Sequence, residues 1–168
     1  MLTLKAAGAV LALTAAVLYG LLGLLLLKRR QKTIKELTRA VIYITSGIEF
    51  SQKPMTLIFN ELAARNTGAV GSMFQSLADG LSKRQNCAEL WALGLDKLLF
   101  SAEERDIFMP LGACLGMTDK SIQLKTAEML LSDAREYEKR LNEQIEKYKA
   151  SDLRLRIMCG IITVILFV

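Results

Sequence analysis

The residues that could do chemistry in this chain are few and scattered. The 168-residue sequence has no histidine, the commonest general base and metal ligand. Its three cysteines, Cys87, Cys114 and Cys159, form no Cys-x-x-Cys pair, and we expect them to be small buried hydrophobes. Phosphate-binding glycine loops and nucleophile elbows are absent, and no carboxylate stands in a glycine-marked apolar stretch. We therefore expect no enzyme, with no catalytic, cofactor-binding or metal site.

The elements around these residues begin with a run of 22 uncharged residues, Ala6 to Leu27. At about 1.5 Å per residue such a helix crosses a bilayer core of about 30 Å. A basic collar follows at once, and by the positive-inside rule it places the N-terminus outside and the rest in the cytoplasm. The collar residues are Lys28, Arg29, Arg30, Lys32 and Lys35. A signal peptide is the alternative, but its charges should precede the apolar run. We predict a membrane anchor over residues 1–27.

Charge is uneven along the chain. The overall net charge is +5, yet residues 28–39 alone carry six bases and one acid. Residues 40–153 carry 13 bases and 16 acids, so the main argument for nucleic-acid binding is lost. The collar is best explained as a topology signal near anionic headgroups, with a specific lipid site as the alternative.

Small residues recur every four positions inside the predicted anchor, at Gly8, Ala12, Ala16 and Gly20. A face of this kind lets another membrane helix approach closely. Small residues are common in membrane spans, so chance spacing is the competing explanation. We keep both: a helix-packing face in the membrane, or coincidence.

Beyond the anchor the apolar residues recur every three or four positions, which predicts an all-α fold. A stripe from Ile34 to Ile48 continues the first helix. Four short helices should then start near Pro54, Val70, Asn86 and Ser101, the last with a capping box completed by Glu104. Trp91 is expected in the core of this compact bundle. The predicted cytoplasmic domain spans residues 28–156.

The last predicted helix runs from Asp119 to Arg156 and carries an approximate heptad seam for another chain or its own first helix. The seam consists of Leu124, Ala127, Leu131, Ala134, Leu141, Ile145, Tyr148 and Leu155. Residues 157–168 are uncharged but too short to span an ordinary bilayer. Because Arg154 and Arg156 precede them, we expect a short membrane-returning segment.

A specific resemblance lies at Leu115-Gly116-Met117-Thr118-Asp119, followed by Gln123 and Lys125. Together with Gly112 and the run Ile48-x-Phe50-x-x-x-Pro54-Met55, this pattern resembles the stage III sporulation protein AB family over essentially the whole chain. One departure is Gly47, where the family usually has a glutamate. Any role of that acid is therefore in doubt here.

The resemblance implies a non-enzymatic component of the channel complex between mother cell and forespore in endospore-forming bacteria. The helical domain of the family is similar to the cytoplasmic platform domains of type II secretion and type IV pilus machines. It thus implies a cytoplasmic secretion-type ATPase partner, similar to stage III sporulation protein AA, other channel-complex membrane proteins, and a place in the mother-cell membrane facing the forespore. A homo-oligomer is left open. The rival interpretations are a generic coiled-coil tether and a small pore-former or membrane enzyme.

We place the partner-binding surface at the turn where the resemblance is densest, and each residue there also has a structural interpretation. Asp119 can cap the long helix, Gln123 and Lys125 can form a solvated face, and Gly112 and Gly116 can permit close packing and helix termination. The surface comprises Gly112, Gly116, Asp119, Gln123 and Lys125.

Overall fold

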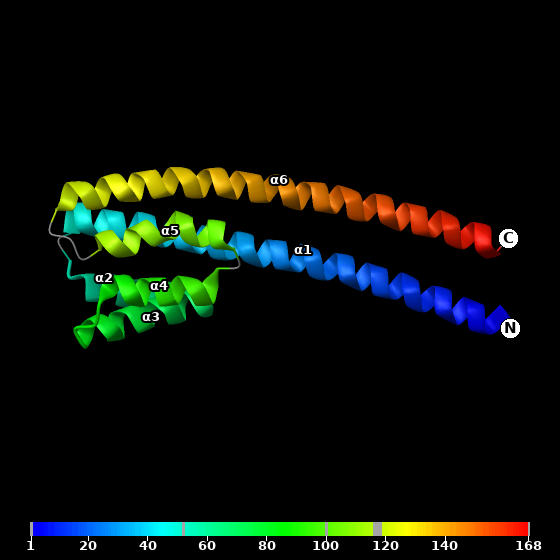
Figure 1. Cartoon of the computed structure of the whole chain (residues 1–168), viewed down its shortest axis with the longest axis horizontal. Helices are drawn as coiled ribbons and strands as arrows, with labels where there is room; N and C mark the ends of the chain where they lie inside the picture. Colours follow the sequence, from blue (N-terminus) through cyan, green and yellow to red (C-terminus); the bar gives the residue numbers. More distant parts are fainter. Residues whose placement is uncertain (1, 52, 100, 116–118, 168) are drawn as a thin grey trace. The chain divides into compact units, whose positions relative to one another are not determined.

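Every regular element in the described part of the chain is a helix, which confirms the all-α prediction. The computed structural model (Figure 1) describes the backbone of residues 2–51, 53–99, 101–115 and 119–167, and the side chains of residues 14, 22–50, 53–99, 101–115 and 119–150. The elements are α1 (Leu2–Ser46), the π-helix η1 (Gly47–Ser51), α2 (Met55–Arg65), α3 (Ala69–Ser82), α4 (Cys87–Leu98), α5 (Ala102–Cys114) and α6 (Lys120–Phe167).

The chain divides into two compact units. Unit 1 contains residues 1–29 and 140–168, and unit 2 contains residues 30–139. The long helices α1 and α6 therefore contribute to both units, whereas α2 to α5 lie wholly in unit 2. The two units are defined by contacts within the chain. The predicted boundaries at residues 27 and 156, between membrane and cytoplasmic segments, are a different division and stay a prediction.

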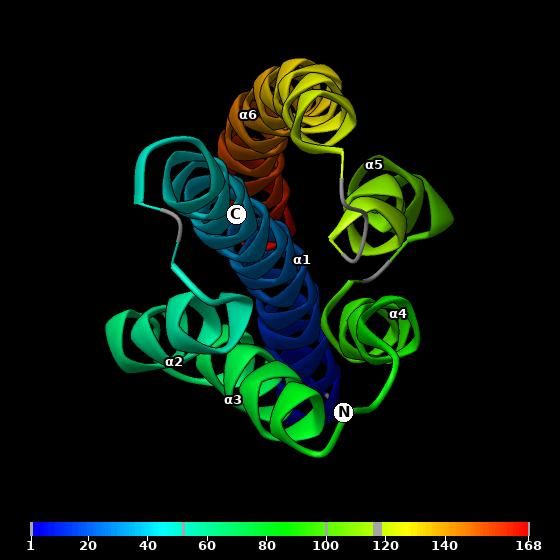
Figure 2. The ribbon, with the colours of Figure 1, turned by 90° about the vertical axis from the view of Figure 1, so that its left-hand side faces the viewer.

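Unit 2 holds an apolar core built from short helices that pack in chain order. Helix α2 packs on α3, α3 on α4 and α4 on α5 (Figure 2). Phe59, Phe74 and Trp91 join the first three of these helices, with ring centroids 5.9 and 6.2 Å apart. All three aromatic side chains are fully buried, and the predicted core position of Trp91 is confirmed.

Local sequence signals set the boundaries of the short helices. The Asn86 side chain caps α4 by accepting from Ala88 N at 2.9 Å. The capping box of α5 is present as predicted: Ser101 Oγ accepts from Glu104 N, and Glu104 Oε2 accepts from Ser101 N, both at 3.2 Å. These bonds satisfy amides that the first turn of a helix leaves without partners.

Helix α1 carries the predicted stripe into unit 2. Ile34, Leu37, Val41 and Ile44 are fully buried, while Ile48 is half-buried. Helix α1 ends at Ser46 and is followed directly by η1, a π-helical turn that begins at Gly47. The helical path of the chain therefore runs on to Ser51 before α2 begins.

Helix α6 differs from its prediction in length and in its seam. It is one helix from Lys120 to Phe167, so residues 157–167 continue it and form no separate helix. The buried positions include four predicted ones, Ala127, Ala134, Leu141 and Ile145, together with Leu130 and Tyr137, which the predicted seam lacked. Leu124, Leu131 and Tyr148 are half-buried, and Leu155 lies outside the described side chains. Tyr137 joins the seam because its hydroxyl finds polar partners in unit 2.

Within unit 1 the two long helices approach each other closely. A Cβ at Gly23 would lie 2.3 Å from the Tyr148 hydroxyl oxygen, closer than carbon and oxygen atoms can stand. A larger residue at position 23 would require the half-buried Tyr148 ring to shift. At Tyr148 the predicted seam of α6 thus packs on the first helix of its own chain, which was one of the two predicted options.

Among the described residues, no helix has both the length and the apolar character needed to cross a membrane. The anchor predicted for residues 1–27 is therefore without support from the structure and stays a prediction. The small residues Gly8, Ala12, Ala16 and Gly20 lie outside the residues whose side chains are described.

Candidate functional site

Unit 2 brings together the two sequence stretches that carry the family resemblance. Lys120 begins α6 and donates from Nζ to the backbone oxygen of Glu49 in η1, at 2.7 Å across 71 residues. Next to Glu49, the side chain of Phe50 is 77% exposed, the highest value among the exposed large hydrophobic residues. We call this region, residues 47–50 and 119–125, the η1–α6 junction.

Gly47 explains how the chain departs from the family pattern at this junction. A Cβ at position 47 would lie 2.7 Å from Ile58 Cδ1 of α2. Ile58 itself is fully buried. In this chain the space beside Gly47 is therefore filled by an apolar side chain, and a glutamate there would have to displace it.

Gly112 serves the core beneath the predicted partner surface. It is buried in α5, and a Cβ there would lie 2.5 to 2.8 Å from three atoms of Trp91. The indole Nε1 donates to the Phe108 carbonyl at 2.9 Å, so the ring is fixed against α5. The close approach expected of Gly112 is observed. The other predicted glycine, Gly116, lies outside the described residues.

Asp119 caps α6. Its Oδ1 accepts from Ser121 N and Ser121 Oγ at 2.8 Å and from Ile122 N at 3.4 Å. The hydrogen bonds from the Ser121 hydroxyl, the Ser121 amide and the Ile122 amide lower the pKa of the Asp119 carboxyl, since they favour its charged form. The carboxylate remains exposed, so capping leaves one of its edges open to solvent.

Gln123 is buried, and the expected solvated position is wrong for this residue. Its side chain is 9% exposed, and Nε2 donates to the Cys114 carbonyl at 3.0 Å. The last carbonyls of α5 have no partner within their own helix, and the Gln123 amide supplies one. Gln123 therefore ties the start of α6 to the end of α5.

The outward face of the first turns of α6 is formed by other residues. Lys125 is exposed as predicted, between Ile122 at 46% and Met129 at 62% exposure. The spacing of three and four residues places these side chains on one face. The junction thus presents a base between two apolar side chains on α6 and an aromatic ring on η1.

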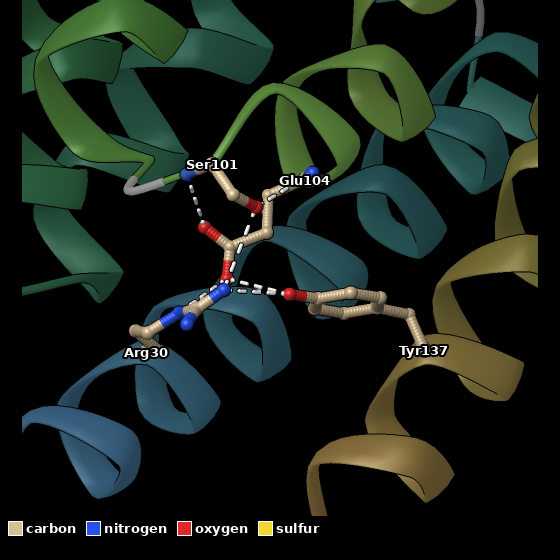
Figure 3. A network of polar contacts seen from close by, with 4 residues as sticks. All are labelled: Arg30, Ser101, Glu104 and Tyr137. Carbon is tan, nitrogen blue, oxygen red and sulfur yellow. Dashed lines mark hydrogen bonds and ion pairs between the residues drawn. The ribbon is translucent and has the colours of Figure 1, made fainter.

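A buried polar network joins α1, α5 and α6 at the other end of unit 2 from the junction, and we call it the polar clamp. It consists of Arg30 of α1, Ser101 and Glu104 at the start of α5, and Tyr137 of α6 (Figure 3). Arg30 Nε donates to Glu104 Oε1 at 2.8 Å, and Arg30 Nη2 donates to the Tyr137 hydroxyl at 2.8 Å. That hydroxyl donates in turn to Glu104 Oε1 at 3.1 Å. Arg30 is therefore more than a collar residue, because it holds α5 and α6 against α1.

Electrostatics keep Arg30 and Tyr137 of the clamp in their hydrogen-bonding forms. The Glu104 side chain is 1% exposed and the Arg30 side chain 26%. Burial lowers the pKa of Arg30, but the hydrogen bond and charge of Glu104 outweigh burial and raise it overall. Burial is also the main cause that raises the pKa of Tyr137, so its hydroxyl stays protonated at neutral pH and donates. This arrangement stabilises the contacts among α1, α5 and α6.

The sequence model of the family "Stage III sporulation protein AB" matches residues 5–168, nearly the whole chain. The chain belongs to the stage III sporulation protein AB family. A solved structure titled stage III sporulation protein AB is similar to it, with a TM-score of 0.64 and 20% sequence identity. The similarity covers 70% of this chain and 97% of that one. No curated protein matches the chain.

The matched range contains both stretches that meet at the Lys120–Glu49 contact. The solved structure, at 20% identity, supports the fold alone. In the described residues of this family member, which are all-α, the two stretches that carry the sequence resemblance lie together at one end of unit 2.

Proposed function

We propose that this protein is a non-enzymatic, membrane-anchored adaptor of the sporulation channel complex. It docks a cytoplasmic secretion-type ATPase, similar to stage III sporulation protein AA, through the η1–α6 junction. The channel complex and the ATPase come from the family resemblance. The location of the docking surface is inferred from the contacts and exposed side chains of the η1–α6 junction.

One observation carries this proposal: two stretches separated by 71 residues converge at the Lys120–Glu49 contact and leave Phe50 exposed. An aromatic side chain that is 77% exposed loses favourable burial unless a partner covers it. Aromatic anchors surrounded by polar residues are typical of binding hot spots. Lys125 and the exposed edge of Asp119 supply polar groups that can set the orientation of a partner.

Membrane attachment belongs to the proposal and rests on the sequence. The uncharged run from Ala6 to Leu27 and the collar that follows it support an N-terminus outside and unit 2 in the cytoplasm. The residues Ser76 and Ser132 are exposed and suit single-cysteine labelling. In a cysteine-free background, cysteines at both positions should react with a membrane-impermeant thiol reagent only after cell lysis. Labelling of both before lysis would reverse the orientation.

A generic coiled-coil tether is the alternative, and the short helices argue against it. A tether needs only its long helices, whereas α2 to α5 enclose a core around Trp91, Phe59 and Phe74. A core of this kind stabilises a specific surface shape. We therefore favour a docking domain over a spacer.

The docking test compares two junction variants with a matched control. Phe50→Ala and Lys125→Glu should leave the protein folded and abundant, because both side chains are exposed. Each should lower co-purification of the ATPase by about tenfold or more, as expected when a hot-spot residue is lost. The control is Leu93→Ala, an exposed apolar residue of α4 that lies outside the junction. Normal recruitment by the double variant Phe50→Ala, Lys125→Glu would place the ATPase contact elsewhere.

A further inference from the structure

The polar clamp joins two long helices, α1 and α6, that each carry a repetitive stripe of buried apolar residues. On α1 the buried stripe is Ile34, Leu37, Val41 and Ile44. On α6 the corresponding stripe is Ala127, Leu130, Ala134 and Tyr137. Both stripes have the same alternating steps of three and four residues. The Thr38 hydroxyl, 3.0 Å from Glu138 Oε1, holds the two helices side by side.

Repetition of this kind leaves the relative position of the two helices along their axes poorly defined. When one helix slides by a turn, about 5.4 Å, the apolar stripes still overlap. One-turn displacements of packed helices are a known form of conformational change. Apolar packing between α1 and α6 therefore favours contact without selecting one register strongly.

The polar clamp does select one register. Glu104 is 0% exposed, and in the present position its Oε1 receives Arg30 Nε from α1 and the Tyr137 hydroxyl from α6. A slide of one turn on either helix would remove one of these donors and leave a buried carboxylate with fewer partners. Breaking a buried, hydrogen-bonded ion pair is strongly unfavourable.

We propose that the polar clamp is a register lock for α1, α5 and α6 within unit 2. Arg30, Glu104 and Tyr137 are positioning residues: they fix which turn of α1 faces which turn of α6. Each of these helices also leads to the η1–α6 junction. The register set at the clamp therefore determines how η1 on α1 meets the first turn of α6.

A register role differs from a simple contribution to stability. Replacement of a buried ion pair by apolar side chains of similar volume is often neutral or stabilising. Single polar residues in helical seams can nonetheless specify register at a cost in stability. A register lock thus predicts that a variant with apolar residues in place of the clamp residues keeps its fold but no longer holds α1 and α6 in a single register.

The test measures distances between spin labels on the full-length protein in detergent micelles or nanodiscs. The labels are attached at Lys32→Cys on α1 and Glu128→Cys on α6, both exposed positions in unit 2. The native cysteines are replaced by Cys87→Ser, Cys114→Ala and Cys159→Ser. With the clamp intact, pulsed electron resonance should give one narrow distance distribution.

The decisive variant is Arg30→Met, Glu104→Leu, Tyr137→Phe. It should remain helical and melt cooperatively, yet show a second distance population displaced by about 5 Å, one helical turn. A single distance identical to that of the intact clamp would overturn the proposal, whatever happens to the melting temperature. If this variant fails to fold, Arg30→Met, Glu104→Gln, Tyr137→Phe decides by the same criterion, because both donors to Oε1 are removed while glutamine keeps the volume and an acceptor for Ser101 N.

A matched control removes an ion pair that does not join α1 and α6. Lys53 Nζ and Glu61 Oε1 stand 2.8 Å apart, with side chains 38% and 28% exposed. Lys53→Met, Glu61→Leu should leave the distance distribution unchanged. A second population in this control as well would mean that loss of any ion pair loosens the helices, which would also overturn a specific register role.

Discussion

The two ends of unit 2 use polar side chains in opposite ways. At the polar clamp, Glu104 is buried and its oxygens are engaged by Arg30, Tyr137 and the Ser101 amide. At the η1–α6 junction, Lys125 and the Asp119 carboxylate are exposed, and Phe50 is the most exposed large apolar side chain described. The same three helices, α1, α5 and α6, connect both ends.

This difference separates the residues that specify the fold from those available to a partner. A buried charge has a large energetic effect when its partner is removed, whereas an exposed charge contributes little to stability. Mutations at the clamp should therefore change the free energy of unfolding. Mutations on the outward face of the junction should change binding and leave that free energy almost unaltered.

The largest stability effect is expected for Glu104→Ala. This change leaves Arg30 without its ion-pair partner and removes half of the capping box. We expect a loss of about 2–4 kcal/mol, near the range for broken buried pairs but lowered by solvent access to Arg30, whose side chain is 26% exposed. Denaturant unfolding followed by circular dichroism measures it. Asp106→Ala, an exposed acid on the same helix, is the control and should stay within about 0.5 kcal/mol.

A smaller loss is expected for Gly112→Ala, which probes the core beneath the junction. Alanine favours helix over glycine by about 1 kcal/mol. The new Cβ would, however, lie 2.5 Å from Trp91 Cδ1, and overpacking costs about 1–3 kcal/mol. We expect net destabilisation of about 1 kcal/mol with a red-shifted Trp91 fluorescence. An unchanged or raised stability would mean that the indole moves aside freely. Ala113→Ser, on the exposed side of α5, is the matched control.

Gln123→Ala tests whether a junction residue can behave like a clamp residue. Removal of the amide leaves the buried Cys114 carbonyl without the donor at 3.0 Å, and an unsatisfied buried group costs about 1–2 kcal/mol. Lys125→Ala, two residues further along α6, should stay within about 0.5 kcal/mol. Equal stabilities of the two variants would contradict the difference drawn between inward and outward faces of the junction.

The smallest effect is a pH dependence at the cap of α6. The pKa of Asp119 lies below its ordinary value of 3.8 in the folded protein, so the charged carboxylate stabilises the fold above that value. This contribution is lost as the pH falls through the lowered pKa. Asp119→Asn keeps a capping oxygen and removes the titration.

The readout is the difference in melting temperature between wild type and Asp119→Asn from pH 7 to pH 2.5. The hydrogen bond from Lys53 lowers the pKa of Glu61 too, but that group is present in both proteins and cancels in the difference. The advantage of wild type should shrink only below about pH 4. A constant difference over the whole range would show that the charge of Asp119 does not contribute.

Local signals in the sequence were sufficient to predict the short helices. Pro54, Asn86 and the Ser101–Glu104 pair mark helix starts through backbone geometry and capping, which depend on residues only a few positions apart. The apolar period likewise predicted the buried stripe from Ile34 to Ile44. These features required no knowledge of which helices meet.

Long-range partners could not be predicted in the same way. Arg30 belongs to a basic collar by its neighbours, yet its main partner Glu104 lies 74 residues away. Gln123 resembles a solvated residue in the first turn of a helix, but it faces carbonyls at the end of α5. One signal was available: those carbonyls need donors, and a nearby amide side chain can supply one.

The Thr38–Glu138 contact also has a consequence for how the protein is made. These residues are 100 positions apart, so the partner of α1 in unit 2 emerges from the ribosome long after α1 itself. At about 5–20 residues per second, the apolar stripe of α1 waits roughly 5–20 s for α6. Meanwhile α2 to α5 can pair with their neighbours in sequence, since local contacts form quickly. Folding therefore proceeds from the middle of the chain outward, and the nascent α1 is the segment that most needs shielding from aggregation.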